Sequence, residues 1–331
     1  MSFATADGTV QAVRGISFGV DRGRTLGIVG ESGSGKSVAT QTIIGLTQGA
    51  EVSGRALFRG RDLLTMSADE LRRTRGREIA LIFQDPLSSL HPHYRVGWQI
   101  AEVIRAHEST SRADARKRVV ELLRLVGIPQ PDRRVDDFPH QFSGGMRQRA
   151  MIAMALALNP ELLIADEPTT ALDVTVQAQI LELMKRLQAE FETAIILITH
   201  DLGVIAQIAD DVLVMYAGQA METADRRAVY YRPHHPYTKG LLESLPARED
   251  TGARLTPIAG LPPSLIRLPS GCPFHPRCRY VMERCRSEPP ALRAVEGAAH
   301  RSACWLPADA LGLSPEAEAR RAEAAGTGAP R

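Results

Sequence analysis

The feature that most constrains this chain is an eight-residue loop that begins at Gly30 and ends at Ser37. It reads Gly-Glu-Ser-Gly-Ser-Gly-Lys-Ser and matches the G-x-x-x-x-G-K-S pattern of phosphate-binding loops. The apolar run Leu26 to Val29 predicts a strand before the loop, and residues 36–46 predict a helix after it. A strand, a glycine-rich loop and a helix N-terminus in this order cradle phosphate oxygens on backbone N–H groups. We therefore predict a nucleotide site.

The residue types of the loop suit this chemistry. Glycines let the backbone close around phosphates without a Cβ clash. Lys36 would reach the β- and γ-phosphates, and the hydroxyl of Ser37 would bind Mg²⁺. The predicted nucleotide-binding residues here are Gly30, Glu31, Ser32, Gly33, Ser34, Gly35, Lys36, Ser37 and Val38. A flexible Gly/Ser-rich linker is the alternative, and the patterned flanks disfavour it.

The length, charge and hydropathy of the chain exclude several classes of protein. Its 331 residues allow a large core and more than one domain. The formal net charge is +2 without a basic block, so we expect no nucleic-acid partner. No apolar run approaches the roughly 18 residues of a membrane span, and the N-terminus lacks the pattern of a secretion signal. We expect a cytosolic chain that reaches any membrane through a partner.

Short apolar stretches alternate with helical patterns along most of the chain. The strand-like stretches are residues 10–20, 56–58, 79–83, 162–165, 194–199 and 212–216. Alternation of this kind predicts an α/β fold with a mostly parallel sheet and a ligand at its carboxyl edge. Gly30, Gln84, Asp166 and His200 each follow the end of a predicted strand, so we expect them to converge.

The composition divides the chain into segments. Residues 97–158 look helical, with Ser111 as the N-cap of one helix and Ser143 opening another. Prolines recur after Tyr230 and exclude long helices there. We predict a nucleotide-binding α/β domain over residues 1–230 with a helical subdomain at about 86–158, a loop-rich module over 231–307, and a disordered tail over 308–331.

Two adjacent carboxylates, Asp166 and Glu167, follow the apolar run 162–165. A strand-end Asp is the second motif of nucleotide sites and holds Mg²⁺. Glu167 would then polarise the attacking water as a general base. A solvated turn is the alternative, and the phosphate-binding loop makes it the weaker one.

All four cysteines fall within one short segment, as Cys272, Cys278, Cys285 and Cys304. Such a cluster in a reducing compartment favours a metal site over disulfides. The spacing C-x5-C-x6-C-x18-C lacks the C-x2-C pairs usual for structural zinc and differs from common ferredoxin patterns. By spacing alone, zinc and an iron–sulfur cluster remain equal alternatives.

The order of these motifs resembles the ATPase subunits of ABC transporters. The motifs are the phosphate-binding loop, Gln84, Phe142-Ser143-Gly144-Gly145-Met146, residues 162–167, Ala171-Leu172-Asp173 and His200. The signature of that family is normally L-S-G-G-Q, so Phe142 and Met146 depart from it. This variant, the run Arg-Pro-His-His-Pro-Tyr-Thr at 232–238 and the cysteines resemble the D-type ATPase subunit of the oligopeptide and dipeptide importers.

The resemblance implies a P-loop NTPase fold of the ABC type with an inserted helical subdomain and a small C-terminal cysteine module. It implies head-to-tail pairing of two ATPase subunits around ATP, with Ser143, Gly144 and Gly145 closing the partner's site. Asp173 would bridge the subunits. His200 would contact the γ-phosphate, and Gln84 would sense the γ-phosphate and Mg²⁺. The implied catalytic residues are Lys36, Glu167 and His200, and the implied Mg²⁺ ligands are Ser37, Gln84 and Asp166.

The resemblance also implies partners and a metal group. The partners are a second, non-identical ATPase subunit, two membrane-spanning permease subunits and an extracytoplasmic peptide-binding protein, at the cytoplasmic face of the inner membrane. The four cysteines would hold a [4Fe–4S] cluster, with zinc as the lesser alternative. Phe3 would stack on adenine, or else anchor the N-terminal strand. The expected function is ATP-driven peptide import. The alternatives are an importer of nickel or glutathione and a soluble ABC ATPase without transport.

Overall fold

A mixed sheet forms the centre of the protein. The computed structural model describes residues 1–85, 89–170, 172–245, 257–307 and 310–312, and within these the sheet has eight strands in the order β12-β13-β11-β10-β3-β9-β8-β7. From β10 to β7 each strand runs parallel to its neighbours. The parallel strands are β3 (Thr25–Val29), β7 (Ile79–Ile82), β8 (Leu162–Asp166), β9 (Ala194–Thr199) and β10 (Asp211–Tyr216). The α/β class and the parallel sheet that the sequence predicts are confirmed.

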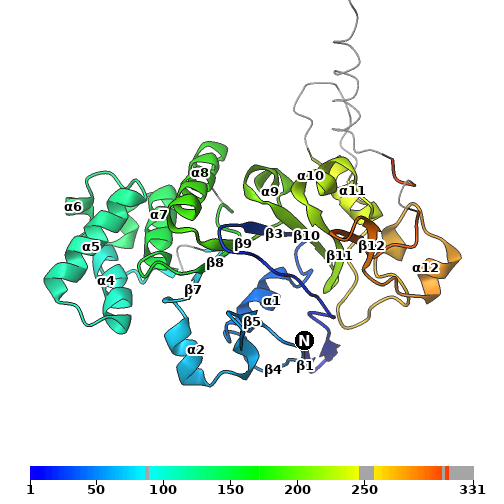
Figure 1. Cartoon of the computed structure of the whole chain (residues 1–331), viewed down its shortest axis with the longest axis horizontal. Coiled ribbons are helices and arrows are strands. Elements are labelled where there is room, and N and C mark those ends of the chain that lie inside the picture. Colours follow the sequence, from blue (N-terminus) through cyan, green and yellow to red (C-terminus); the bar gives the residue numbers. More distant parts are fainter. Residues whose placement is uncertain (86–88, 171, 246–256, 308–309, 313–331) are drawn as a thin grey trace, which may run out of the picture.

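Helices cover both faces of this sheet (Figure 1). On one side lies α1 (Lys36–Ile43), and on the other lie α8 (Val174–Phe191) and α9 (Leu202–Ile208). Because the parallel strands are buried on both faces, they read as continuous apolar runs. Successive residues of β3 illustrate this, since Ile28 and Val29 belong to the cores on opposite faces.

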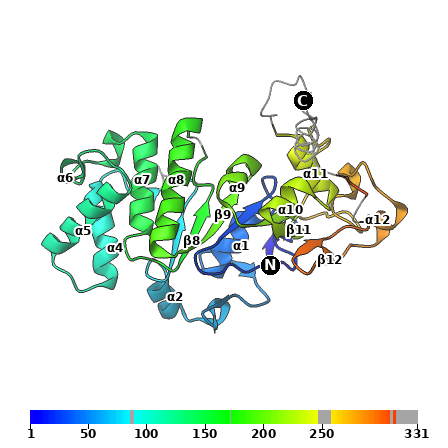
Figure 2. The same ribbon diagram turned by 45° about the horizontal axis from the view of Figure 1, so that its top comes forward.

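A group of helices lies at one end of the molecule (Figures 1 and 2). These helices are α4 (Val96–His107), α5 (Arg112–Leu125), α6 (Pro131–Arg134) and α7 (Gly144–Ala155). In sequence they fall between β7 and β8, inside the predicted helical insertion. Ser111 caps α5, as predicted, by accepting the N–H of Asp114 at 3.1 Å. Val119 and Leu123 of α5 are fully buried against α4 and α7.

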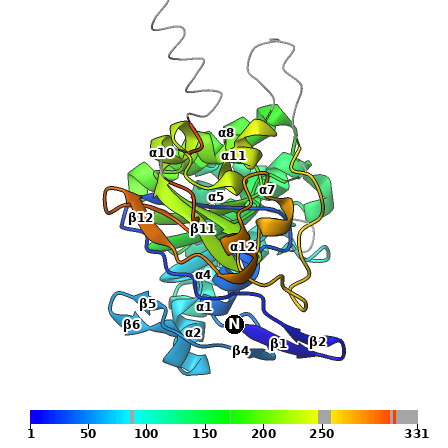
Figure 3. The same cartoon turned by 90° about the vertical axis from the view of Figure 1, so that its right-hand side faces the viewer.

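A smaller sheet lies apart from the central one (Figure 3). It consists of β2 (Gly8–Val10), β1 (Ser2–Thr5) and β4 (Ala50–Glu51). The prediction of a strand over residues 10–20 is wrong, because the segment after Val10 is irregular. Its N–H groups pair with separate segments instead: that of Gln11 with Leu265 O at 3.0 Å and that of Arg14 with Gly218 O at 2.7 Å.

The remaining elements are short. They are β5 (Leu57–Phe58), β6 (Arg61–Asp62), α2 (Ala68–Thr74), α10 (Arg226–Tyr231), α11 (Pro236–Glu243) and α12 (Glu283–Ser287), with 3-10 turns at Leu63–Thr65, Pro139–Gln141 and His275–Arg277. The predicted tail lies outside the described residues except for 310–312. Within the described part, no helix combines the length and apolarity needed to cross a bilayer.

The proline-rich C-terminal segment is joined to the central sheet rather than standing apart from it. Strand β11 (Gln219–Asp225) pairs antiparallel with β10 and with β13 (His300–Ser302), which in turn pairs with β12 (Arg293–Glu296). Figure 1 shows these strands continuing the sheet at the end opposite the helical group. The edge of the sheet is therefore built by the part of the chain that contains the cysteines.

Candidate functional site: a nucleotide site and a cysteine cavity

The phosphate-binding loop connects β3 to α1, as predicted. Its backbone is held closely against β10, the neighbour of β3 in the sheet: a Cβ on Gly30 would lie 2.1 Å from Met215 O. Gly35 has a φ of +94° at the N-cap of α1, and a Cβ there would lie 2.3 Å from Ala12 O. Only glycine fits at these two positions. The loop is thus shaped by close backbone packing as well as by its own turns.

Lys36 lies inside the loop. Its ammonium donates to Gly30 O at 2.7 Å and to Glu31 O at 3.0 Å. Burial lowers the pKa of Lys36, although the carboxylates of Glu167, Asp166 and Glu31 oppose this. The ammonium is therefore held as a positive charge at the point where the loop's N–H groups would surround phosphate oxygens.

Ser37 and Asp166, predicted as Mg²⁺ ligands, lie in direct contact. The hydroxyl of Ser37 donates to Asp166 Oδ1 at 2.7 Å, and Gln41 Nε2 lies 3.4 Å from Oδ2. Burial raises the pKa of Asp166 and the adjacent Glu167 adds to this, while Ser37 opposes it. A hydroxyl and a carboxylate at the edge of a phosphate loop are suited to a hard divalent cation. Gln41 was missed, since nothing in its local pattern sets it apart.

Glu167 is held by three side chains. Its Oε2 accepts from Gln84 Nε2 at 3.0 Å and from Thr170 Oγ1 at 2.8 Å, and its Oε1 lies 3.1 Å from His200 Nδ1. Burial alone would raise the pKa of Glu167, but the hydrogen bonds of His200 and Thr170 lower it overall. Its φ of +47° is rare for a residue other than glycine and is typical of functional positions. The predicted convergence of strand-end residues thus occurs, with Thr170 added.

The two adjacent carboxyl groups are pushed in opposite directions. Burial favours the protonated form of Asp166, whereas hydrogen-bond donors favour the ionised form of Glu167. The two environments therefore push the pKa values of these neighbouring carboxyl groups apart.

The Ser-Gly-Gly segment forms a second surface. Ser143 caps α7 by accepting the N–H of Met146 at 3.3 Å, and Asp173 caps α8 by accepting the N–H of Val176 at 2.9 Å. Ser143, Gly144, Gly145 and Asp173 line one open pocket, and the described lining contains no residue of the phosphate-binding loop. The N-terminus of a helix offers free N–H groups to an anion. The chain therefore carries two phosphate-compatible surfaces that do not meet within it.

Arg149 also lines this pocket and was missed at the sequence level. Its guanidinium donates to Val126 O at 2.6 Å and to Gln179 Oε1 at 3.1 Å. Burial lowers the pKa of Arg149, and Arg186 adds to this. The one signal for Arg149 in the sequence is its position one helical turn after Gly145, which places it near the predicted Ser-Gly-Gly surface.

Phe3 lies in β1, where it pairs with Val10 and Ala50. Its side chain is half-buried in the small sheet. This is the placement expected of an anchor for the N-terminal strand, and its role beside adenine stays a prediction.

The C-terminal segment reaches the phosphate-binding loop directly. Arg277 Nη1 and Nη2 lie 2.6 and 2.9 Å from the two carboxylate oxygens of Glu31. The Arg277 side chain is only 5% exposed, and it also donates to Tyr216 Oη at 3.2 Å. Tyr237 Oη accepts the N–H of Glu31 at 2.9 Å. A two-pronged arginine–carboxylate pair with this burial fixes the conformation of the loop residue it holds.

The four cysteines line one small cavity. Cys272, Cys278, Cys285 and Cys304 are all free thiols, and Cys272 N–H donates to Cys285 O at 2.8 Å. Burial raises the pKa of Cys272 to about 12 and that of Cys278 to about 11, and the other thiols add to both. Gathered thiols of this kind are the donor set of zinc and iron–sulfur sites. The disulfide alternative has no support in this geometry.

Two family models match the chain. Residues 13–170 match the ABC transporter model, and residues 221–285 match the model for the C-terminal region of oligopeptide/dipeptide transporters. Among solved structures, a dimeric post-hydrolysis state of the ATP-binding cassette MJ0796 bound to ADP and Pi is similar, with a TM-score of 0.62 and 27% identity. That likeness covers 68% of this chain and 95% of the other.

Curated relatives are similar over nearly the whole chain. An oligopeptide transport ATP-binding protein, OppD of Bacillus subtilis, is 55% identical over 92% of this chain and 86% of the relative. A dipeptide transport ATP-binding protein, DppD of the same organism, is 53% identical over 92% of each. OppD of Salmonella typhimurium is 52% identical over 94% of this chain and 92% of the relative. The chain belongs to the ATP-binding proteins of ABC transporters, in the branch that carries the oligopeptide/dipeptide transporter C-terminal region.

Proposed function

We propose that this chain hydrolyses ATP to power the import of oligopeptides or dipeptides through an ABC transporter. The observation that carries the proposal is the grouping in one site of Lys36, the Ser37–Asp166 contact and Glu167. The carboxylate of Glu167 is held there by hydrogen bonds. The C-terminal region at 221–285 and the relatives named as peptide transport ATP-binding proteins support the choice of cargo.

Hydrolysis follows from the placement of these residues. Lys36 and the loop's N–H groups would bind the β- and γ-phosphates, while Ser37, Asp166 and Gln84 would hold Mg²⁺, which would neutralise phosphate charge. Glu167, kept ionised by its donors, accepts a proton from the attacking water. His200 is more exposed than Glu167, so it can reach toward the bound nucleotide, where it would contact the γ-phosphate.

A second ATPase subunit completes the site. The pocket of Ser143, Gly144, Gly145 and Asp173 lies apart from the phosphate-binding loop of its own chain, so it serves the loop of a partner. We propose that the partner is non-identical, and that the pair works with two membrane-spanning permeases and an extracytoplasmic peptide-binding protein. The chain is then peripheral, at the cytoplasmic face of the inner membrane.

Purification from membranes tests the transport assignment. An affinity-tagged chain, extracted in mild detergent, should bring down two membrane-spanning subunits and one different ATPase. In vesicles, the purified complex should hydrolyse ATP faster with a peptide-loaded binding protein than with the same protein empty. An untagged strain is the control. Recovery of the tagged chain without any membrane subunit would favour a soluble ABC ATPase. Stimulation of ATP hydrolysis only by a nickel chelate or by glutathione would change the cargo that we assign.

We propose that the cysteine cavity forms a C-terminal metal module and holds a [4Fe–4S] cluster. Four free thiols around one cavity fit the four thiolate ligands of such a cluster, and zinc is the lesser alternative. The bound group would neutralise the four gathered thiolates and lock the loops of this segment together. The role that we propose for this group is structural or regulatory.

The absorbance spectrum of the anaerobically purified chain separates the two groups. A broad band in the visible region, lost on exposure to air, is expected for the cluster. The Cys285→Ser variant should lose the band, whereas a chain altered at an exposed position, Glu283→Gln, should keep it. A colourless parent protein that carries zinc would contradict the cluster.

A further inference from the structure

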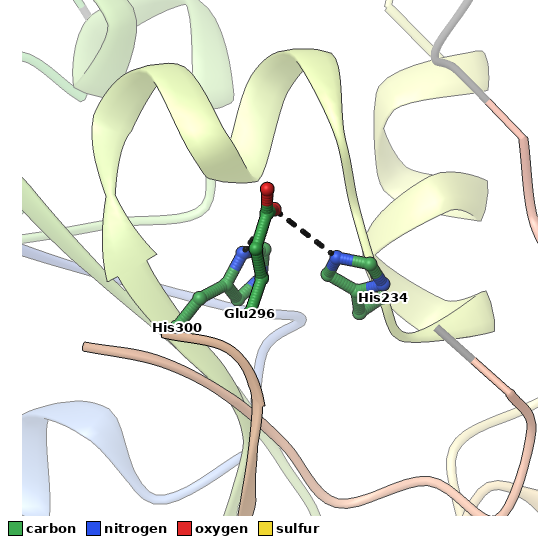
Figure 4. A group of neighbouring side chains, drawn as sticks. All are labelled: His234, Glu296 and His300. Atoms are coloured by element: carbon green, nitrogen blue, oxygen red, sulfur yellow. Dashed lines mark ion pairs between the residues drawn. The ribbon is translucent and has the colours of Figure 1, made fainter. Parts of the chain in front are cut away.

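A second group of metal-ligand side chains lies outside the cysteine cavity (Figure 4). His234 lies in the connection from α10 to α11, while Glu296 and His300 flank the turn between β12 and β13. One ligand atom from each residue lies within 4.8 Å of the other two. Figure 4 shows the three side chains facing one another from two separate segments of the chain.

The imidazole nitrogens of this group lack hydrogen-bond partners. Among the described residues, Nδ1 and Nε2 of His234 and Nδ1 of His300 are buried with no donor or acceptor in range. Orphaned polar atoms in the interior cost free energy and call for a ligand. His300 is only 4% exposed, so solvent does not satisfy its free nitrogen.

The buried Glu222 fixes which nitrogen of His300 carries the proton. The carboxylate of Glu222 is fully buried. It accepts the backbone N–H of His234 at 2.6 Å and the backbone N–H of His235 at 3.1 Å. It therefore acts as an acceptor, and His300 Nε2, 2.7 Å from Glu222 Oε1, is the donor. In the neutral imidazole with this tautomer, the lone pair lies on His300 Nδ1. A carboxylate that orients the far side of an imidazole in this way is the usual support of a histidine metal ligand.

The free lone pair faces a negative charge. His300 Nδ1 lies 3.9 Å from Glu296 Oε2, and His234 Nε2 lies 3.7 Å from the same oxygen. Both distances are too long for hydrogen bonds. Glu296 Oε1 pairs with Arg232, which leaves Oε2 to face the two imidazoles. A cation between the two imidazoles and the carboxylate oxygen would satisfy all three at once.

The spacing suits a small transition-metal ion. Ligands at zinc–nitrogen and zinc–oxygen bond lengths in a tetrahedron lie about 3.3 Å apart. The two histidine–glutamate separations exceed this by about half an ångström, which small side-chain rotations supply. Glu296 is 43% exposed, so water can take the fourth position. Nitrogen and carboxylate donors favour Zn²⁺, Ni²⁺, Cu²⁺ or Co²⁺ over Mg²⁺ and Ca²⁺.

We propose that His234, Glu296 and His300 bind one divalent first-row transition-metal ion, best matched by Zn²⁺. The ion ties the α10–α11 connection to the β12–β13 hairpin and so anchors the outer edge of the central sheet. This site is distinct in ligand chemistry from the cysteine cavity and does not depend on the group held there.

Metal content and Co²⁺ spectroscopy on the full chain test the site. The parent, loaded with Zn²⁺ and then dialysed, should retain one equivalent more than His234→Ala/Glu296→Gln. The Co²⁺ spectrum of the parent minus that of the variant should show the visible bands of a four-coordinate ion without the near-ultraviolet band of thiolate ligation, because both proteins keep the cysteine cavity. Zn²⁺ at about 100 times its dissociation constant should raise the Tm of the parent by about 4 °C more than that of the variant.

A matched double variant controls for loss of one imidazole and one carboxylate. His140 and Glu283 are exposed and lie outside the cluster, so His140→Ala/Glu283→Gln should keep the extra equivalent. Should the first double variant fail to fold, Glu296→Gln alone changes one exposed side chain and should weaken Zn²⁺ binding at least about 10-fold. Equal zinc content and affinity in the parent and Glu296→Gln, or a purely thiolate Co²⁺ spectrum, would overturn the proposal.

Discussion

Glu167→Gln is expected to lower the rate of ATP hydrolysis at least about 100-fold while ATP still binds. The glutamine side chain keeps the size of the carboxylate and can still meet Gln84 and Thr170, so the site keeps its shape. It cannot accept a proton from water. The residues that hold the phosphates and Mg²⁺, Lys36, Ser37 and Asp166, are unchanged.

The measurement is steady-state phosphate release by the assembled complex, with the affinity for a fluorescent ATP analogue measured in parallel. Glu182→Gln, an exposed change on α8, is the matched control and should hydrolyse ATP at the parental rate. Asp166→Asn should instead weaken the binding of Mg²⁺, because it removes the carboxylate that lies beside Ser37. Turnover by Glu167→Gln within a few-fold of the parent would remove Glu167 from the role of general base.

Gly35→Ala is expected to cost about 3 kcal/mol of folding free energy and to lower ATP affinity at least about 10-fold. At a φ of +94°, alanine has a higher conformational energy than glycine, and its Cβ would lie 2.3 Å from Ala12 O. The backbone at residue 35 and at Ala12 must then move apart. Because Gly35 is the N-cap of α1, the movement shifts the N–H groups that would hold phosphate.

Gly23→Ala separates the two causes. Gly23 has a φ of +69°, and a Cβ there meets no atom within 4 Å, so only the backbone cost of about 1 kcal/mol remains. Urea unfolding of the two variants, with ATP affinity by calorimetry, gives the comparison. Equal losses of stability would show that the contact with Ala12 is unimportant, and unchanged ATP affinity in Gly35→Ala would show that the loop adapts.

Local patterns predicted the elements that hold the nucleotide site. The strand before the loop and the strand ending at Asp166 were both readable from runs of apolar residues. The meeting of Gln84 with Glu167 was also predictable, since parallel strands share a carboxyl edge. Signals of this kind need only neighbouring residues.

Contacts between distant segments were not predictable. Arg277 and Glu31 are 246 residues apart, and neither has a pattern that points to the other. The addition of β13 to β11 likewise depends on how the proline-rich segment folds back. The strand predicted over residues 10–20 was wrong for a different reason. Apolar residues are spaced there as in a strand, but they pack against the core without pairing to a neighbouring strand. The loop residue Glu31 was found, but its partner required the structure.

The Arg277–Glu31 pair joins the phosphate-binding loop to the segment that lines the cysteine cavity. Arg277 directly precedes Cys278, so a group that orders this cysteine also orders the arginine that holds the phosphate-binding loop. Linked equilibria act equally in both directions. A chain that binds ATP more tightly when the cavity is filled must therefore hold the group in the cavity more tightly, by the same factor, when ATP is present.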